Sequence, residues 1–330
     1  MDLVGIFGDS LRYGVGEFTM VFALAALGVN LQFGYCGLLN FGQAGFAAAG
    51  AYGVAVAVGH FGWSFALGVS TSLLAAVVLG LLLGFPTLRL RGDYLAIVTI
   101  AASEIIRFVL QASNFRGVTG GADGLQGFAG TFRDLNPIPP GRHGFWRLEF
   151  SSSVLWVMLV GWLLVAAFAV LTHLLIESPW GRVVKGIRED EDAVRSLGKN
   201  VYAYKMQVLV LGGAMGAVAG LMDGLARGSA TPANYQPGFT FFAYVMVILG
   251  GTAKVWAPIV GAIVFNTLLQ FSDLFLRAAN DSFVPSWLVG DDDVGAVRFV
   301  LMGGALMALM VFRPQGIFGD RREVAIGARR

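Results

Sequence analysis

Long apolar intervals that are free of charge set the pattern of this chain. No Asp, Glu, Lys or Arg occurs between Glu17 and Arg89, and shorter charge-free stretches recur as far as Phe312. Because a bilayer-spanning helix needs about 20 apolar residues, the first interval alone has room for three spans. The pattern therefore predicts a chain whose helices cross a membrane repeatedly.

The charge-free intervals divide the chain into eight or nine expected membrane segments. Their high glycine content does not argue against helix, because glycine is common in membrane helices. The stretch Gln32–Gly50 is so rich in glycine and amide side chains that we expect part of it to be a broken or re-entrant helix. The expected spans are Phe18–Phe33, Tyr35–Val58, Trp63–Phe85, Tyr94–Gln111, Ser152–Ile176, Met206–Ala226, Phe239–Gly251, Ala257–Leu276 and Val294–Phe312.

Composition agrees with an all-α, polytopic membrane protein, with residues 1–330 forming a single transmembrane domain. Hydrophobic residues make up 56% of the chain and charged residues 13%, whereas soluble proteins carry about 25% charged residues. Cys36 is the only cysteine, which excludes a disulfide-stapled scaffold. The first residues lack a basic stretch and a small-residue cleavage site, so we expect no cleaved signal peptide. The net charge of +2 gives no indication of nucleic-acid binding.

Clusters of Lys and Arg predict the side of the membrane that each connection faces. The segment 177–205 and the tail 313–330 are both basic, so we expect both on the cytoplasmic side. The spans between them then alternate consistently and place the acidic loop 280–293 outside. The loop 113–151 is also outside, although it holds four Arg, because two strong basic clusters outweigh one mixed loop. Arg89, Arg91 and Lys254 fall inside.

The cytoplasmic segment 177–205 is too polar to span and too regular to be a plain connector. Pro179 suits a first helical turn, and Gly198 is a natural helix stop. Asp190 and Asp192 suggest a second start, so we expect two short helices with an apolar stripe. Such helices suit docking to a soluble partner, and a solvated loop that only sets topology is the alternative. The residues assigned to docking are Gly181, Arg182, Ile187, Arg188, Glu189, Glu191, Leu197 and Gly198.

Polar side chains inside two expected spans are candidates for a translocation pathway. Amides in lipid, such as Asn40 and Gln43, either bond neighbouring helices or line a wet path. Glu104 and Arg107 share a helix face and can pair, which either locks the bundle or contacts substrate. The candidate pathway residues are Asn40, Gly42, Gln43, Gly45, Glu104 and Arg107.

Two further glycine patterns stand out. The sequence TGGADGL indicates an external gate or receptor contact, or else a plain tight turn; its candidate residues are Thr119, Gly120, Gly121 and Asp123. A ridge of glycines at every fourth position favours close packing against another helix or subunit. Asp223 interrupts the same helix near its outer end, where we expect water to reach it. The ridge consists of Gly212, Gly216, Gly220 and Gly224.

No catalytic constellation is visible in the sequence. The chain has no G-x-x-x-x-G-K-[ST] phosphate loop, so we expect no ATP site in it. The three histidines are scattered, whereas a metal cluster needs ligands at matched spacing, so we expect no metal site. These absences favour a non-catalytic membrane subunit or a transporter.

Five sequence blocks, in order, resemble one known family. They are GYCGLLNFGQAGFAAAGAYG, GDYLAIVTIAASEIIRFVL with TGGADGL, SPWGRVVKGIREDEDAVRSLG, VILGGTAKVWAPIVGAIVF and FRPQGIFG. Together they are similar to the larger, M-type permease subunit of branched-chain amino acid ABC importers. The resemblance covers roughly Gln32 to Gly319.

The resemblance implies a bacterial inner-membrane complex with a division of labour. A related second permease subunit would pair with this chain, and a periplasmic or extracellular binding protein would deliver substrate. Two ATP-binding subunits would dock on the cytoplasmic side at residues 177–205 and would hold the ATP and Mg, so this chain needs no cofactor of its own. The E-A-A-x-x-x-G motif of ABC importers in general is matched only in spacing, by Asp192, Ala193 and Gly198.

Two other functions stay open at this point. Permeases for urea or short amides share the same architecture, and the motifs do not separate these substrates from amino acids. A stand-alone secondary transporter would need an ion-coupling site at mid-membrane, for which Glu104 and Arg107 are the only candidates.

Overall fold

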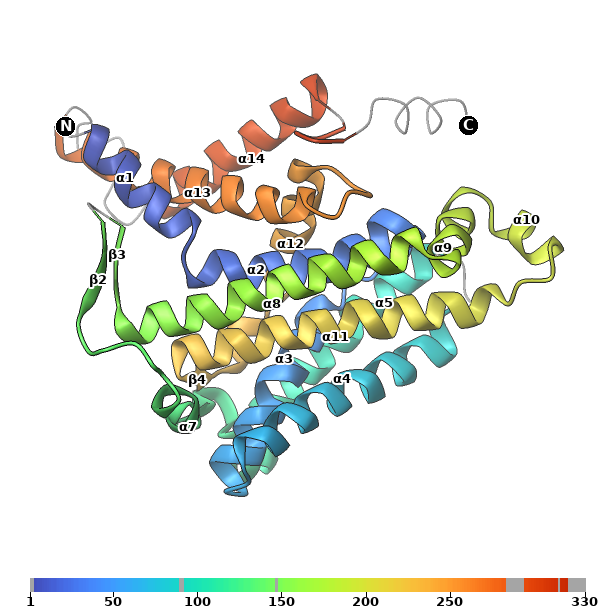
Figure 1. The fold of residues 1–330 in the computed structure, drawn as a ribbon, viewed down its shortest axis with the longest axis horizontal. Coiled ribbons are helices and arrows are strands. Elements are labelled where there is room, and N and C mark those ends of the chain that lie inside the picture. The colour runs from blue at the N-terminus through green and yellow to red at the C-terminus, as the bar shows by residue number, and fades with distance from the viewer. Residues whose placement is uncertain (1–2, 89–91, 146–147, 283–293, 314, 320–330) are drawn as a thin grey trace.

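The computed structural model describes residues 3–88, 92–145, 148–282, 294–313 and 315–319. Its long helices run side by side and form one elongated bundle (Figure 1). Two short helices, α9 (Pro179–Glu189) and α10 (Glu191–Ser196), project at one end of the bundle. A hairpin of β2 (Arg142–Phe145) and β3 (Leu148–Ser151) lies at the other. We name these the α9–α10 end and the β2–β3 end.

Six helices of the described chain are long and apolar enough to cross a bilayer. They cover Glu17–Tyr35, Phe65–Thr87, Tyr94–Gln111, Ser152–Glu177, Val201–Arg227 and Ala257–Ala278, close to six of the expected spans. Two apolar helical stretches, Pro237–Gly250 and Gly295–Gly304, are shorter. The main helical elements are α1 (Leu3–Gly14), α2 (Glu17–Val29), the π-helical η1 (Asn30–Tyr35), α3 (Gln43–Val54), the π-helical η2 (Ala55–His60), α4 (Phe65–Thr87), α5 (Gly92–Gln111), α8 (Ser152–Glu177), α11 (Val201–Arg227), α12 (Pro237–Gly250), α13 (Ala257–Ser282) and α14 (Val294–Phe312).

The expectation of a purely α-helical chain needs one correction. Besides the β2–β3 hairpin, β1 (Leu125–Gln126) pairs antiparallel with β4 (Ser229–Ala230). This second pair joins the predicted loop 113–151 to the end of α11, more than a hundred residues further along the chain. The loop is therefore a small folded cap rather than a plain connection.

The N-terminal helix α1 was not among the expected elements. It packs against α13, and the guanidinium of its Arg12 lies 5.2 Å from the centre of the Phe150 ring in β3. The helix contains Asp9 and Arg12, so it does not stand out as a charge-free apolar interval. α1 is thus a short helix at the β2–β3 end.

The expected break in the second span is present. Helix ends at Cys36, residues 37–42 are non-helical, and α3 begins only at Gln43. The break therefore lies in the first part of the expected span Tyr35–Val58. Gly37 has a φ of +72°, a left-handed conformation that glycine adopts without steric cost.

The glycine ridge of α11 packs against helices of the same chain. A β-carbon at Gly220 would overlap the carbonyl oxygen of Ala47 in α3, and one at Gly216 would overlap the Gln43 side chain. A β-carbon at Gly212 would lie 2.6 Å from the Gln32 side chain. In membranes such close approach replaces the hydrophobic drive that water supplies elsewhere. The ridge therefore holds α11 against α3 and the end of α2.

We predict that Gly220→Ala destabilises the chain. One added methyl group forces α3 and α11 apart, which we expect to cost about 1–3 kcal/mol of unfolding free energy. Gly304→Ala in α14 is the matched control, because its β-carbon would meet nothing within 4 Å. Thermal unfolding of the purified variants in detergent measures both. Equal midpoints for the two variants would contradict the seam.

Candidate functional site

The broken segment 37–42 is largely covered, with Leu38, Asn40 and Gly42 buried and Gly37 exposed. Side chains from other helices bond its backbone. The Tyr244 hydroxyl of α12 donates to the Asn40 carbonyl oxygen at 2.9 Å. The Thr99 hydroxyl oxygen of α5 accepts from the Phe41 N–H at 3.0 Å, and that of Thr240 accepts from the Ala44 N–H at 2.8 Å. Since an unpaired backbone group in hydrocarbon costs several kcal/mol, these bonds allow a helix to break inside the bundle.

Three fully buried amide side chains continue this network to α11. The Asn40 Nδ2 donates to Gln32 Oε1 at 2.9 Å, and Gln32 Nε2 donates to the Leu209 carbonyl oxygen at 3.0 Å. The Gln43 Nε2 donates to the Gly212 carbonyl oxygen at 3.1 Å. In this conformation Asn40 and Gln43 are bonded to protein rather than exposed to a wet path. Their place in a translocation pathway stays a prediction.

The two pathway glycines face α5. A β-carbon at Gly42 would lie 2.7 Å from the Thr99 carbonyl oxygen, and one at Gly45 would lie 3.0 Å from Ser103 Cβ. They let the start of α3 approach α5 closely. Their contacts therefore concern packing in this conformation.

Glu104 and Arg107 form the expected pair on α5. Arg107 Nε donates to Glu104 Oε1 at 2.9 Å, and Arg107 Nη2 to Oε2 at 2.6 Å. The side chains are 26% and 15% exposed, respectively. In this bidentate, partly covered pair each charge satisfies the other. Contact of either residue with substrate stays a prediction.

The segment 177–205 contains the two short helices that the sequence predicts. Pro179 is the first residue of α9, and Gly198 ends the second helical stretch with a φ of +74°. The Asp190 carboxylate caps α10 by accepting from the Asp192 and Ala193 N–H groups, each at 3.0 Å. These caps fix a sharp corner between α9 and α10.

The apolar stripe of these helices faces the bundle, which corrects the expected docking face. Val184 and Ile187 are 0% and 4% exposed, whereas Leu197 is 79% exposed. Gly181 is also buried, and it packs so closely that a β-carbon there would overlap the Ile176 carbonyl oxygen. Ile187 therefore cannot meet a partner in this conformation, and Leu197 can.

The charged residues of the segment also divide into two groups. Arg182 and Glu189 are exposed, as expected for a partner-facing rim. Arg188 and Glu191 are half-buried. Arg188 Nη1 donates to the Gly34 carbonyl oxygen at 2.6 Å, and Glu191 pairs with Lys205 of α11.

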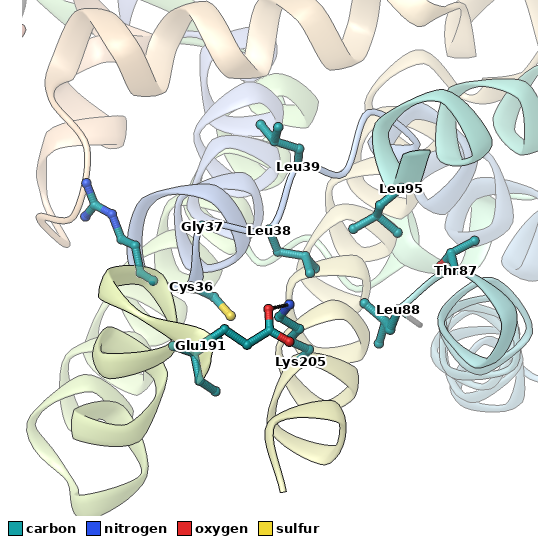
Figure 2. Close-up of a pocket in the computed structure, with 11 residues that line it drawn as sticks. Cys36, Gly37, Leu38, Leu39, Thr87, Leu88, Leu95, Glu191 and Lys205 are labelled. Carbon is teal, nitrogen blue, oxygen red and sulfur yellow. Dashed lines mark hydrogen bonds and ion pairs between the residues drawn. The ribbon is translucent and has the colours of Figure 1, made fainter. Parts of the chain in front are cut away.

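A cavity of about 170 Å³ lies between these helices and the start of the break. Figure 2 shows the Glu191 carboxylate and the Lys205 ammonium meeting beside the sulfur of Cys36, with Leu38 and Leu95 opposite. The cavity joins α9, α11 and the broken segment at one place.

Asn30 ties a third element to this end. Its Nδ2 donates to the Lys254 carbonyl oxygen at 3.0 Å, and its Oδ1 accepts from the Ala253 N–H at 3.1 Å. The loop after α12 is thereby fixed to η1, one turn from the Gly34 carbonyl that Arg188 binds. Of the basic tail 313–330, only Arg313 and residues 315–319 are described; Ile317 and Phe318 donate N–H bonds to the last turn of α12.

The TGGADGL sequence forms a tight turn at the opposite end of α5. Gly120 and Gly121 both have positive φ, and the Thr119 hydroxyl oxygen accepts from the Gly121 N–H at 3.3 Å. Asp123 pairs with Arg116 at 2.9 Å on the surface. A role in gating or receptor contact stays a prediction.

Asp223 is more buried than expected. It is 4% exposed, and Arg227 Nε donates to its Oδ1 at 2.8 Å. The Tyr235 hydroxyl donates to its Oδ2 at 3.3 Å. The spacing of Asp223 and Arg227, four residues apart on α11, was the signal for this pair.

Several site residues carried no clear signal in the sequence. Thr99, Thr240 and Tyr244 are ordinary residues of apolar helices, and only the fold brings them to the break. No group of three or more His, Cys, Asp and Glu side chains able to hold a metal occurs in the described part of the chain.

Comparisons with known proteins identify related chains. Residues 15–290 match the family model for the "Branched-chain amino acid transport system / permease component". The high-affinity branched-chain amino acid transport system permease protein LivM of Escherichia coli K12 is 32% identical over 313 residues, covering 92% of this chain and 69% of LivM. LivH of the same organism is 24% identical over 273 residues, covering 77% and 82%.

The chain also matches solved structures at low sequence identity. A chain of PsaBC from Streptococcus pneumoniae in complex with Fab is 13% identical, with a TM-score of 0.44 over 93% of this chain and 95% of that chain.

We predict that Arg188→Ala exposes Cys36. Losing a charge-assisted bond worth about 1.5–3 kcal/mol should let residues 34–37 open more often, and thiol labelling of Cys36 should accelerate about tenfold or more. Arg182→Ala on the exposed side of α9 is the control and should leave labelling slow. Maleimide kinetics at neutral pH measure both; equal rates would show that Arg188 does not hold this segment.

Proposed function

This chain belongs to the branched-chain amino acid transport permease family, and we propose that it is the membrane subunit of an ATP-driven importer of branched-chain amino acids. The observation that carries the proposal is the α9–α10 unit. It is joined at both ends to long apolar helices, and Arg188 and Glu191 bond it to the broken segment and to α11. Such a rigid link suits the transfer of motion from soluble ATPases to membrane helices.

We further propose that the chain makes nine passes through the inner membrane. To the six long helices we add the segment 37–60, α12 and α14. The α9–α10 end is assigned to the cytoplasm, together with the tail 313–330, and the β2–β3 end to the outside. This keeps the basic segments inside and the loop 113–151 outside.

Partners are assigned to the two ends. Two ATP-binding subunits, which hold the ATP and Mg, dock on the exposed side of α9 and α10, where Arg182, Glu189 and Leu197 lie. A substrate-binding protein docks at the outer end, near Thr119 and Asp123. A related second permease subunit completes the pathway, and the similarity to both LivM and LivH supports this pairing.

Urea or amide transport and a stand-alone secondary transporter are less well supported. The names of both relatives refer to branched-chain amino acids. An ion-coupled transporter needs a mid-membrane coupling site, and Glu104 and Arg107 already satisfy each other. Amino acid import powered by partner subunits is therefore the function that the observations favour.

Reconstitution in liposomes tests the function directly. We expect the chain alone to transport nothing, and the complex with its permease, ATPase and receptor partners to take up leucine only with ATP. Urea uptake by the same complex provides the comparison. ATP-independent accumulation by the chain alone, or uptake of urea but not leucine, would refute the proposal.

We predict that Leu197→Asp and Ile187→Asp fail for different reasons. Leu197 is exposed, so its variant should keep the stability of the chain and lose co-purification with the ATPases. Ile187 is buried, so its variant should lower the unfolding free energy by several kcal/mol. Thermal unfolding and co-purification separate the two. An L197D variant that still binds and couples ATPases would contradict the docking face.

A further inference from the structure

A second recess, of about 210 Å³, opens at the outer end of the bundle. It lies where α11 ends, α12 begins and α2 passes between them. Its apolar side is formed by Phe22, Phe239 and Phe242, and its charged side by Asp223 and Arg227. At about 30 Å³ per water it holds roughly seven waters, a volume on the scale of a small amino acid.

The charged side of the recess presents one negative group, the Asp223 carboxylate, and one positive group, the Arg227 guanidinium. The Asp223 carboxylate is 4% exposed and accepts one bond from Arg227 Nε and a long one from Tyr235. Among the described residues, the two terminal nitrogens of Arg227 make no hydrogen bond, and its guanidinium lies 4.6 Å from the centre of the Phe18 ring. The fork of Arg227 is thus available for a carboxylate, the group whose planar geometry it matches.

The apolar side is built from packed rings. The centroids of Phe22 and Phe239 are 5.0 Å apart, and those of Phe22 and Phe242 are 6.0 Å apart in an edge-on arrangement. Such a wall suits a branched aliphatic side chain better than a polar one. Gly238 adds room at the mouth, because a β-carbon there would meet nothing within 4 Å.

We propose that this recess binds a free amino acid with an apolar side chain as it enters from the receptor. The ligand carboxylate lies against the terminal nitrogens of Arg227, its ammonium against Asp223, and its side chain against the phenylalanine wall. A zwitterion adds no net charge to a neutral ion pair, whereas a simple anion or cation leaves one charge uncompensated in a half-buried place. This inference rests on the proposed transport function and names the substrate's first contact in the chain.

Protection of an engineered cysteine tests the recess. Gly238→Cys is introduced in a Cys36→Ala background, in the complex reconstituted with its permease and ATPase partners and without receptor. L-Leucine at ten times its dissociation constant should slow maleimide labelling of this cysteine about tenfold. Gly117→Cys is the control; its β-carbon would also meet nothing within 4 Å, and its labelling should not change.

Analogues and variants separate recognition from structure. Compounds that lack one charge, 3-methylbutylamine and 4-methylpentanoate, should protect about tenfold more weakly than leucine. Arg227→Gln should weaken protection by leucine similarly, and Arg227→Lys should restore part of it. Because the protection assay works in the chain with Asp223 and Arg227 intact, a poorly folding Arg227 variant does not prevent a decision.

The result that overturns the inference is distinct from failure of the proposed function. Suppose that the complex with receptor takes up leucine with ATP but that leucine never slows labelling at position 238. The recess is then not a binding site, and the Asp223–Arg227 pair only stabilises the end of α11. Equal protection by leucine and by both analogues would also overturn it. If no amino acid is taken up under any condition, the transport proposal itself fails.

Discussion

The need to pair every backbone polar group inside the bundle is the constraint on which this structure depends. The chain breaks a helix at residues 37–42, which lie largely inside the bundle, and lipid cannot bond the freed backbone groups. Tyr244 and Thr99 bond this backbone from two other helices, and Asn40 bonds it from within. Thr240 bonds the first turn of α3, directly after the break. α12, α5 and α3 can therefore not be moved independently without leaving buried groups unpaired.

The same constraint links the break to the surface. η1 lies directly before the break, and its Gly34 carbonyl binds Arg188 of α9. Lys205, at the start of α11, pairs with Glu191 of α10. A displacement of α9 and α10 therefore acts on η1, next to the break, through Arg188 and on α11 through the Glu191–Lys205 pair. A helix that is already interrupted needs fewer backbone bonds to be broken when it moves.

Much of this arrangement could be predicted from the sequence, and the rest could not for physical reasons. Charge-free intervals locate spans because lipid excludes charge, and glycine with amides marked the break. Proline, aspartate and glycine marked the ends of α9 and α10 because their backbone preferences are local. The inward orientation of Ile187 could not be predicted, because an amphipathic stripe looks the same whether it faces its own bundle or a partner. The burial of Asp223 likewise depends on contacts such as that with Tyr235, which only the fold brings to it.

The central claim is that the bonded break at residues 37–42 changes when α9 and α10 are driven by ATPase subunits. Hydrogen exchange of the Leu38, Phe41 and Gly42 amides in the assembled transporter, with and without a non-hydrolysable ATP analogue, tests it most directly. We expect slow exchange at rest, because all three N–H groups are bonded, and at least about tenfold faster exchange with the nucleotide, while amides at the centre of α4 stay unchanged. Identical slow exchange in both states, or fast exchange at rest, would contradict the account.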